Sequence, residues 1–450
     1  MKAETRFNQI TEKAKENPDI ALNPLACLFM PELSIKKKAK EHPQFVFNSI
    51  AHHLNSELLK KSFKQLRKSA ATGIDGVSYE NYDKNLQENI ITLCKSLKAR
   101  TYKAKALKRV WIDKGKNNKR PIGIASVEDK IVQRAVTTLL NHIYEQDFYN
   151  FSYGFREKHN AHQALDYFRN QSMRRKIKYY INADIKGCFD NFNHKILLGI
   201  LNKRVNDGGI NWLIKQWLET KITDGKQMTV NDNGTPQGGI ISPLLANVYL
   251  HEVVDKWIIQ EIKPQLKGEI FIIRYADDFI IGLQFKSDAE RLYKVLPKRL
   301  SKYELELSLE KSRLQNFVPE NKERNNTIDF LGFTHYWTKS RAGNYLIKRK
   351  TRKKSRNRIL KELYNSIKSN RHKKLREQFV KIKQKLGGYY QYYAIRGNIV
   401  FLKTIYYKSR LFWFRLLNRR GGRKKSYTKE AFNDLIRIFA LPLPKILHNI

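Results

Sequence analysis

The feature that most constrains the fold is a pair of apolar runs with two acidic residues between them. Residues Ile270–Tyr275 and 279–283 favour β-strands, and only Ala276, Asp277 and Asp278 separate them. Two such strands joined by a short turn form a hairpin whose flanks belong in a core. Adjacent carboxylates beside a buried strand repel each other and are costly to desolvate unless a cation compensates them. The hairpin therefore predicts a cation site beside a core.

A third acid, Asp184, lies near the end of another strand-like segment, 178–185, which is rich in Tyr and Ile. If this strand pairs with the hairpin, Asp184 comes close to Asp277 and Asp278. Carboxylate oxygens combined with substrate phosphates are ligands that Mg²⁺ favours. Two such ions can activate a 3′-hydroxyl and stabilise a leaving pyrophosphate. An Asp-Asp pair alone is more often a plain polar turn, so this interpretation depends on the surrounding segments.

Helical patterns alternate with these strands. Ser126 followed by Asp129 resembles a capping box at the start of a helix over 126–148, and Ser242 followed by Pro243 predicts another helix start. The C-terminal part predicts three further helices, over 351–368, 371–386 and 402–417, separated by Gly387-Gly388, Gly397 and Gly421-Gly422. This mixture of helices and strands predicts the α+β class.

The charge of the chain predicts a polyanionic partner. Lys and Arg number 87 against 42 Asp and Glu, a formal net charge of +45, and such a surplus repels itself unless a polyanion binds it. Residues 339–430 contain 30 Lys and Arg but 3 Asp and Glu, which marks a second, basic region. The sequence has no apolar run of about eighteen residues or more, so we expect no membrane-spanning helix. Cys27, Cys94 and Cys188 are isolated, which argues against a disulfide framework and a cysteine-built zinc site.

The ordered motifs resemble reverse transcriptases. Tyr275-Ala276-Asp277-Asp278 is similar to the Tyr-x-Asp-Asp signature, and the order of segments from about Gly73 to Pro444 resembles group II intron-encoded reverse transcriptase/maturases. The other matching segments are Gly73-Ile74-Asp75-Gly76, Arg120-Pro121-Ile122-Gly123-Ile124, Tyr153-Gly154-Phe155-Arg156, Asp184 to Asp190, Thr235-Pro236-Gln237-Gly238-Gly239 and Phe330-Leu331-Gly332-Phe333. The resemblance implies a right-hand polymerase, in which fingers and palm carry the acids on an antiparallel sheet and an α-helical thumb follows. We therefore expect an N-terminal extension over 1–60, fingers and palm over 61–335, and a basic helical thumb/maturase region over 336–450.

The resemblance also assigns metal and nucleotide contacts. It implies two Mg²⁺ ions, or Mn²⁺ in their place, held by Asp184, Asp277, Asp278 and the backbone of Ile185. The implied nucleotide-binding residues are Lys114, Arg120, Phe189, Gln237 and Lys311. Arg and Lys on a hairpin suit the triphosphate, the Phe ring would exclude a 2′-hydroxyl, and Lys311 would neutralise or protonate the pyrophosphate. Four of these residues have a plainer alternative: a solvated charged turn for Lys114 and Arg120, a core ring for Phe189, and an ordinary loop for Gln237. Lys116 or Lys119 could also take the role assigned to Lys114.

The resemblance places the contacts to nucleic acid near and after residue 330. It implies a primer grip at Phe330, Leu331 and Gly332, and a basic, aromatic-rich region that binds the template–primer duplex and intron RNA. The candidate nucleic-acid-binding residues there are Arg349, Lys350, Arg352, Lys353, Lys354, Tyr389 and Tyr390. Many aromatic residues of this region are equally typical of helix packing, and for Trp413 and Phe414 packing is the better interpretation.

Together these features predict an RNA-directed DNA polymerase that also promotes intron RNA splicing. Its expected partners are an RNA template, intron RNA, a DNA primer or target and deoxynucleoside triphosphates, with no membrane, in a bacterial cytoplasm or an organelle. A maturase that binds RNA without polymerising and a free-standing domesticated reverse transcriptase, for example in defence, remain alternatives. An RNA-dependent RNA polymerase is disfavoured by Phe189 and Tyr275. Because no Cys follows Cys188 and the sequence stops at Ile450, we do not expect a Cys/His endonuclease.

Overall fold

The computed structural model describes residues 31–115, 118–174, 176–224, 228–229, 234–235, 238–320, 326–419 and 426–450; of 31–32, 113–115, 118–120 and 228–229 it describes the backbone alone. The α-helices are α3 (Pro31–Glu41), α4 (Ser56–Lys64), α5 (Tyr79–Lys84), α6 (Leu86–Lys98), α7 (Val127–Asp147), α8 (Ala161–Arg174), α9 (His194–Asn202), α10 (Gly208–Leu218), α11 (Ser242–Leu250), α12 (Lys286–Ser301), α13 (Lys353–Ser369), α14 (Leu375–Tyr393), α15 (Ile399–Asn418) and α16 (Lys429–Phe439). Short 3₁₀ helices are η2 (Ala51–His53), η3 (Cys188–Asp190) and η5 (Lys263–Gln265), and η4 (His251–Ile262) is π-helical. The strands are β1 (Leu107–Gly115), β2 (Asn118–Ile124), β3 (Tyr179–Asp184), β4 (Ile222–Thr223), β5 (Met228–Thr229), β6 (Ile270–Tyr275), β7 (Asp278–Leu283), β8 (Arg313–Asn316), β9 (Thr327–Phe330), β10 (Phe333–Lys339) and β11 (Tyr345–Thr351).

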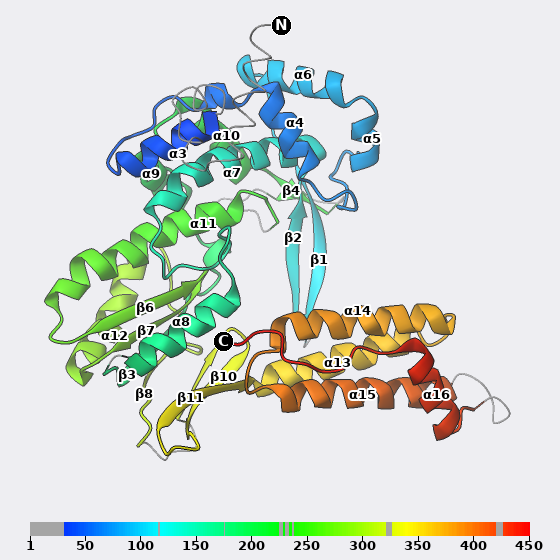
Figure 1. Cartoon of the computed structure of the whole chain (residues 1–450). Helices are drawn as coiled ribbons and strands as arrows, with labels where there is room; N and C mark the ends of the chain where they lie inside the picture. The colour runs from blue at the N-terminus through cyan, green and yellow to red at the C-terminus, as the bar shows by residue number, and fades with distance from the viewer. Residues whose placement is uncertain are drawn as a thin grey trace, which may run out of the picture.

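An antiparallel sheet of order β6-β7-β3-β8, called here the central sheet, lies at the middle of the molecule (Figure 1). Alternate side chains of its strands enter two different cores: Ile181 and Ile272 join one, whereas Tyr180 and Phe271 join the other. Helices α8 and α12 cover its two faces. Because both faces are covered, the strands read in sequence as continuous apolar runs instead of alternating ones. The hairpin expected from the sequence is confirmed.

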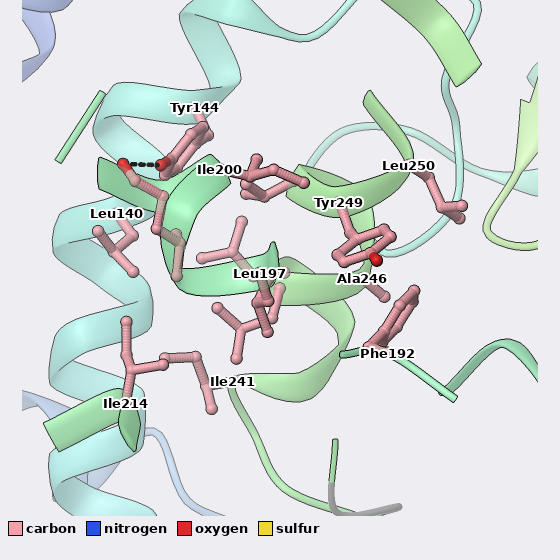
Figure 2. Packing of buried hydrophobic residues seen from close by; sticks show 14 of the residues in the cluster. Leu140, Tyr144, Phe192, Leu197, Ile200, Ile214, Ile241, Ala246, Tyr249 and Leu250 are labelled. Atoms are coloured by element: carbon pink, nitrogen blue, oxygen red, sulfur yellow. Dashed lines mark hydrogen bonds between the residues drawn. The ribbon is translucent and has the colours of Figure 1, made fainter. Parts of the chain in front are cut away.

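Helix α7 is the centre of the upper part of the molecule. Its N-cap is Ser126, whose hydroxyl accepts a hydrogen bond from the Asp129 backbone N–H at 3.1 Å, as the capping box predicts. Leu140 and Tyr144 of α7 pack against residues of α9 and α11 (Figure 2), and the Tyr144 hydroxyl donates to the Leu201 carbonyl at 3.4 Å. Helix α11 begins at Ser242 itself and not after it, because its N-cap is Ile241.

The β1–β2 hairpin projects from this upper part toward the C-terminal helices (Figure 1). It belongs to a four-stranded sheet of order β2-β1-β4-β5. Upstream of it, Phe47 and Leu58 are buried in the same core as α7, and α3 packs on α7. The expected boundary after residue 60 therefore falls inside α4, and residues 31–60 are part of the main core instead of a separate extension.

Helices α13, α14 and α15 pack on one another and form what is called here the C-terminal bundle (Figure 1). A three-stranded sheet of order β11-β10-β9 leads into it, and the expected boundary after residue 335 falls inside β10. The prediction that Gly387-Gly388 ends a helix is wrong, because both glycines lie inside α14. Gly397, with φ of +90°, does lie at a break between helices as expected, and Gly421-Gly422 fall outside the described residues.

Candidate active site

The three aspartates predicted to act together lie at one end of the central sheet. The register between β3 and β7 makes Asp184 the direct partner of Asp278, and Tyr275 of β6 is the other partner of Asp278. Ala276 and Asp277 therefore form the two-residue turn between β6 and β7. Ala276 has a φ of +57°, a left-handed conformation that such hairpin turns require and that costs a non-glycine residue energy.

Negative charge accumulates at this end of the sheet. Burial, followed by the charges of Asp184 and Asp277, raises the pKa of Asp278 to about 7 from its usual 3.8. The Lys311 ammonium compensates part of this charge through an ion pair of 2.6 Å with the Asp184 carboxylate. Within the described residues, no group of three His, Cys, Asp or Glu side chains is gathered closely enough to hold a metal ion. Carboxylate oxygens are the donors that a hard divalent cation favours, and Lys311 pairs with one of them, Oδ2 of Asp184.

A buried polar network that the sequence reasoning missed anchors the Asp277 turn. Arg274 is fully buried, pairs with both carboxylate oxygens of Asp255 at 2.8 and 2.6 Å, and donates to the Ala276 carbonyl at 3.2 Å. Arg274 also donates to the Asn247 side chain at 2.9 Å, and Asn247 donates to the Gly154 carbonyl at 2.7 Å. The sequence did contain a signal for this network. Arg274 is a charged residue within the apolar strand Ile270–Tyr275, and a buried Arg requires a partner.

Gly154 fixes the turn from the other side. A Cβ at this position would lie 2.4 Å from the Ala276 backbone nitrogen, closer than any side chain can approach. The flanking backbone pairs with β6 as well, since Tyr153 N–H donates to the Arg274 carbonyl at 2.9 Å. The segment Tyr153-Gly154-Phe155-Arg156 is therefore packed directly against the aspartate turn.

The structure describes the side chain of Phe189 but not those of Lys114, Arg120 and Gln237, which were also predicted to bind the nucleotide. Phe189 lies in η3, partly buried, with its carbonyl bonded to Thr235 N–H at 2.7 Å. Lys114 and Arg120 lie on β1 and β2, where Arg120 is the register partner of Ile112, but their side chains are outside the described part of the chain. Gln237 also falls outside the described residues.

Gly238, which follows Gln237 in the sequence, approaches the β1–β2 hairpin. It has a φ of +112° and would place a Cβ 2.6 Å from the Gly123 carbonyl oxygen of β2. Only glycine combines this conformation with such a close approach. Gly238 is therefore packed against β2 of the hairpin that carries Lys114 and Arg120.

The expected primer grip is a tight hairpin between β9 and β10. Phe330 and Phe333 are register partners, so Leu331 and Gly332 form the turn, with φ values of +47° and +81°. The Tyr392 hydroxyl of α14 donates to the Leu331 carbonyl at 2.8 Å, which ties the turn to the C-terminal bundle. Phe330 itself is buried, so its side chain supports the turn and does not present a surface.

Basic residues gather beside this turn. A pocket of about 870 Å³ is lined by Thr327, Asp329, Thr334, Lys350, Thr351, Arg352, Lys353, Lys354, Arg356 and Asn357. Arg352 pairs with Asp329 at 2.9 Å and also lowers the pKa of Asp278, in opposition to the larger effects of burial and the other two aspartates. The pocket therefore contains four of the predicted nucleic-acid-binding residues and its electrostatic field reaches the aspartates.

Three other predicted nucleic-acid-binding residues are poorly placed for direct contact. Arg349 is 2% exposed, on β11, and Tyr390 is 4% exposed, with its hydroxyl bonded to the Pro442 carbonyl at 3.3 Å. Tyr389 is partly exposed and donates to the Glu362 carboxylate at 3.4 Å. Burial of Arg349 lowers its pKa to about 10, with the charge of Arg169 adding to the effect. As the sequence suggested for Trp413, many of the aromatic residues here pack in the core.

No helix among the described residues combines the length and apolarity needed to cross a membrane. Cys94 and Cys188 are free, buried thiols, as expected from their spacing.

Comparison with known proteins agrees with this geometry. Residues 112–335 match the model of the family described as reverse transcriptase (RNA-dependent DNA polymerase). The chain is 35% identical over 211 residues to the group II intron-encoded protein LtrA of Lactococcus lactis subsp. cremoris, a match covering 46% of this chain and 34% of the relative. It is 30% identical over 237 residues to protein YkfC of Escherichia coli (strain K12), covering 46% and 62%. It is 25% identical over 224 residues to the nuclear intron maturase 3, mitochondrial, of Arabidopsis thaliana, covering 45% and 30%.

These matches cover less than two thirds of each relative, and the family match, over residues 112–335, contains the three aspartates. The same region carries the ordered motifs of the sequence, and its strands have the register that brings Asp184 beside Asp278. Residues 112–335 therefore form a reverse transcriptase domain, and the similarity to group II intron-encoded proteins supports a group II intron reverse transcriptase/maturase.

Proposed function

We propose that this chain is an RNA-directed DNA polymerase that copies RNA by metal-dependent nucleotidyl transfer. The observation that carries the proposal is the strand register that sets Asp184 opposite Asp278, with Asp277 in the adjoining turn. The buried Arg274–Asp255 pair holds this turn in place, because Arg274 also donates to the Ala276 carbonyl.

The residues that would hold two Mg²⁺ ions are Asp184, Asp277 and Asp278, with the backbone carbonyl of Ile185. The raised pKa of Asp278 supports this assignment, since a divalent cation would relieve the repulsion that raises it. When bound, such ions supply activation of the primer 3′-hydroxyl and stabilisation of the leaving pyrophosphate. Mn²⁺ would fit the same oxygen ligands.

The other residues bind and orient the nucleotide. Lys311 is 65% exposed on its side chain and lies 2.6 Å from Asp184, so it is free to exchange this carboxylate for a phosphate once cations neutralise the aspartates. Lys114 and Arg120 of the β1–β2 hairpin bind the triphosphate from the opposite side. Phe189 lies below the sugar and excludes a 2′-hydroxyl, and Gln237 supports the nascent base pair.

The template–primer duplex binds between the fingers, palm and thumb of a right-hand polymerase. The central sheet is the palm, the β1–β2 hairpin belongs to the fingers, and the C-terminal bundle is the thumb. The pocket lined by Lys350, Arg352, Lys353 and Lys354 binds primer phosphates next to the turn at Leu331 and Gly332. Its position beside the aspartates supports this role, because a primer end must reach them.

We also propose that the chain promotes splicing of an intron RNA. Relatives named as a group II intron-encoded protein and as an intron maturase support this role. The surplus of 27 positive charges in residues 339–430 supplies a surface that suits a structured RNA as well as a primer–template duplex. A maturase without polymerase activity would share this surface but would not require the aspartates.

The test is primer extension by purified protein with Mg²⁺, an RNA template, a DNA primer and deoxynucleotides. The parent extends the primer, whereas Asp277→Ala does not, although it binds the duplex with unchanged affinity. Asp434→Ala, which removes an exposed carboxylate on α16, is the matched control and extends like the parent. Extension by Asp277→Ala at the parental rate would refute the catalytic assignment. A parent that binds RNA but extends no primer would favour the maturase alternative.

A further inference from the structure

Phe155 combines two features that an ordinary surface residue lacks. Its side chain is 58% exposed although it is a large apolar ring, and its φ is +58°. A bulky residue in the left-handed region is a genuine conformational outlier, and this conformation is energetically costly. Strain of this kind persists when neighbouring structure enforces it, and it is concentrated at functional sites.

The residues on either side of Phe155 enforce this conformation. Gly154 packs against the Ala276 turn and its carbonyl accepts from Asn247 at 2.7 Å. Arg156 is 7% exposed, pairs with Glu145 at 2.9 Å and donates to two backbone carbonyls at 2.8 Å each. Both neighbours are therefore fixed, and the ring of Phe155 is held out from the protein beside the aspartate turn.

The ring of Phe155 contacts the ring of Phe189. Their centroids are 6.1 Å apart with an interplanar angle of 89°, an edge-to-face geometry that aromatic rings favour. On another side, Phe189 meets Phe192 at 6.2 Å, also edge to face, and Phe192 is fully buried against Tyr249. Phe189 is therefore held between a buried ring that belongs to the core and an exposed ring that is fixed by its strained backbone.

We infer that Phe155 is a specificity-determining residue that positions Phe189 for the exclusion of ribonucleotides. This inference rests on the proposed role of Phe189 below the nucleotide sugar. A flat ring rejects a 2′-hydroxyl only if it cannot tilt away from it. Phe192 holds Phe189 from the side of the core, and Phe155 supplies the contact that prevents the ring from tilting toward solvent.

The experiment measures the ratio of kcat/KM for deoxynucleotide to kcat/KM for ribonucleotide in primer extension. In Phe155→Ala this discrimination falls about two- to tenfold, because one edge-to-face contact is worth about 0.5–1.5 kcal/mol and each 1.4 kcal/mol is a factor of ten. Phe155→Tyr retains the ring and the discrimination. Phe189→Ala loses more, and Phe155→Ala on that background has no further effect, since the ring that it positions is gone.

Each outcome is decisive. Unchanged discrimination in Phe155→Ala, or an additive loss in the double variant, would refute the positioning role while leaving Phe189 as the gate. Unchanged discrimination in Phe189→Ala would refute the gate and this inference together. Phe155→Gly separates folding from specificity: it removes the backbone strain, so it unfolds at a temperature no lower than the parent, yet it loses discrimination as Phe155→Ala does. A parental level of discrimination in the glycine variant would contradict the inference.

Discussion

Asp278→Asn should stabilise the metal-free protein while it removes polymerase activity. The pKa of Asp278 is raised from 3.8 to about 7, so the folded chain binds a proton that the unfolded chain has released throughout this range of pH. Stability of the parent therefore falls as the pH rises from about 4 to about 7, and the full penalty is present above pH 7. Asn carries no charge, so this variant avoids the penalty.

The size of the effect follows from the shift. A change of about three pKa units corresponds to about 4 kcal/mol at 1.36 kcal/mol per unit. Asp278 is partly exposed and the repulsion is shared with Asp184 and Asp277, so we expect about half of this value, roughly 2 kcal/mol at pH 8. This would raise the melting temperature by roughly 4 °C or somewhat more if the fingers and palm unfold as one unit of about 250 residues.

Thermal unfolding of parent and variant in EDTA, from pH 4 to pH 8, is the assay. The two melting temperatures should agree near pH 4 and diverge as the pH rises. Asp434→Asn makes the same chemical change on an exposed helix and should follow the parent throughout. Saturating Mg²⁺ should reduce the difference at pH 8, because the ions compensate the three carboxylates. If Asp278→Asn melts at or below the parental temperature at pH 8 in EDTA, the repulsion is not present and the reasoning is wrong.

Three further predictions concern the framework and the nucleic-acid surface. Arg274→Met should lower the free energy of unfolding by about 3–5 kcal/mol, because it leaves the buried Asp255 charge unpaired. Urea denaturation tests this, and the double variant Arg274→Met/Asp255→Leu should recover stability because no buried charge remains. Gly388→Ala should stabilise the protein by about 0.5–1 kcal/mol, since Gly388 is exposed inside α14 with nothing near its Cβ position, and a lower denaturation midpoint would contradict the helix. RNA affinity should fall steeply with salt, with a log–log slope of about 0.7 per phosphate contact, and Lys353→Ala should reduce that slope by up to about one contact; a slope insensitive to salt would contradict the assigned surface.

Much of the central sheet could be predicted from the sequence because its signals are local. The runs at Ile270–Tyr275 and 178–185 are apolar and β-favouring, and Ser126 caps α7 where the capping box predicts. The three aspartates could be grouped because a short turn and one assumed strand pairing bring them together. The β3–β7 register supplies that pairing.

What the sequence could not provide depends on tertiary contacts. Gly387 and Gly388 predict a helix break, yet both lie inside α14. Leu386 and Tyr390 on either side pack into the bundle core and stabilise the helix across the two glycines. The sequence places Arg349 in a basic surface run, but strand alternation turns its side chain inward, whereas Lys350 lines the pocket and Lys348 is exposed. The Arg274–Asp255–Asn247 network joins residues on separate elements, and no local pattern announces such a pairing.

The most direct test of the account counts bound metal ions. Electron paramagnetic resonance of Mn²⁺ would be measured on the protein with primer, RNA template and a non-reactive deoxynucleoside triphosphate, in the parent and in Asp184→Asn. The account predicts two ions per active site in the parent and loss of at least one in the variant, with the duplex still bound. The same number of ions with unchanged affinity in both proteins would contradict the claim that these aspartates share divalent cations.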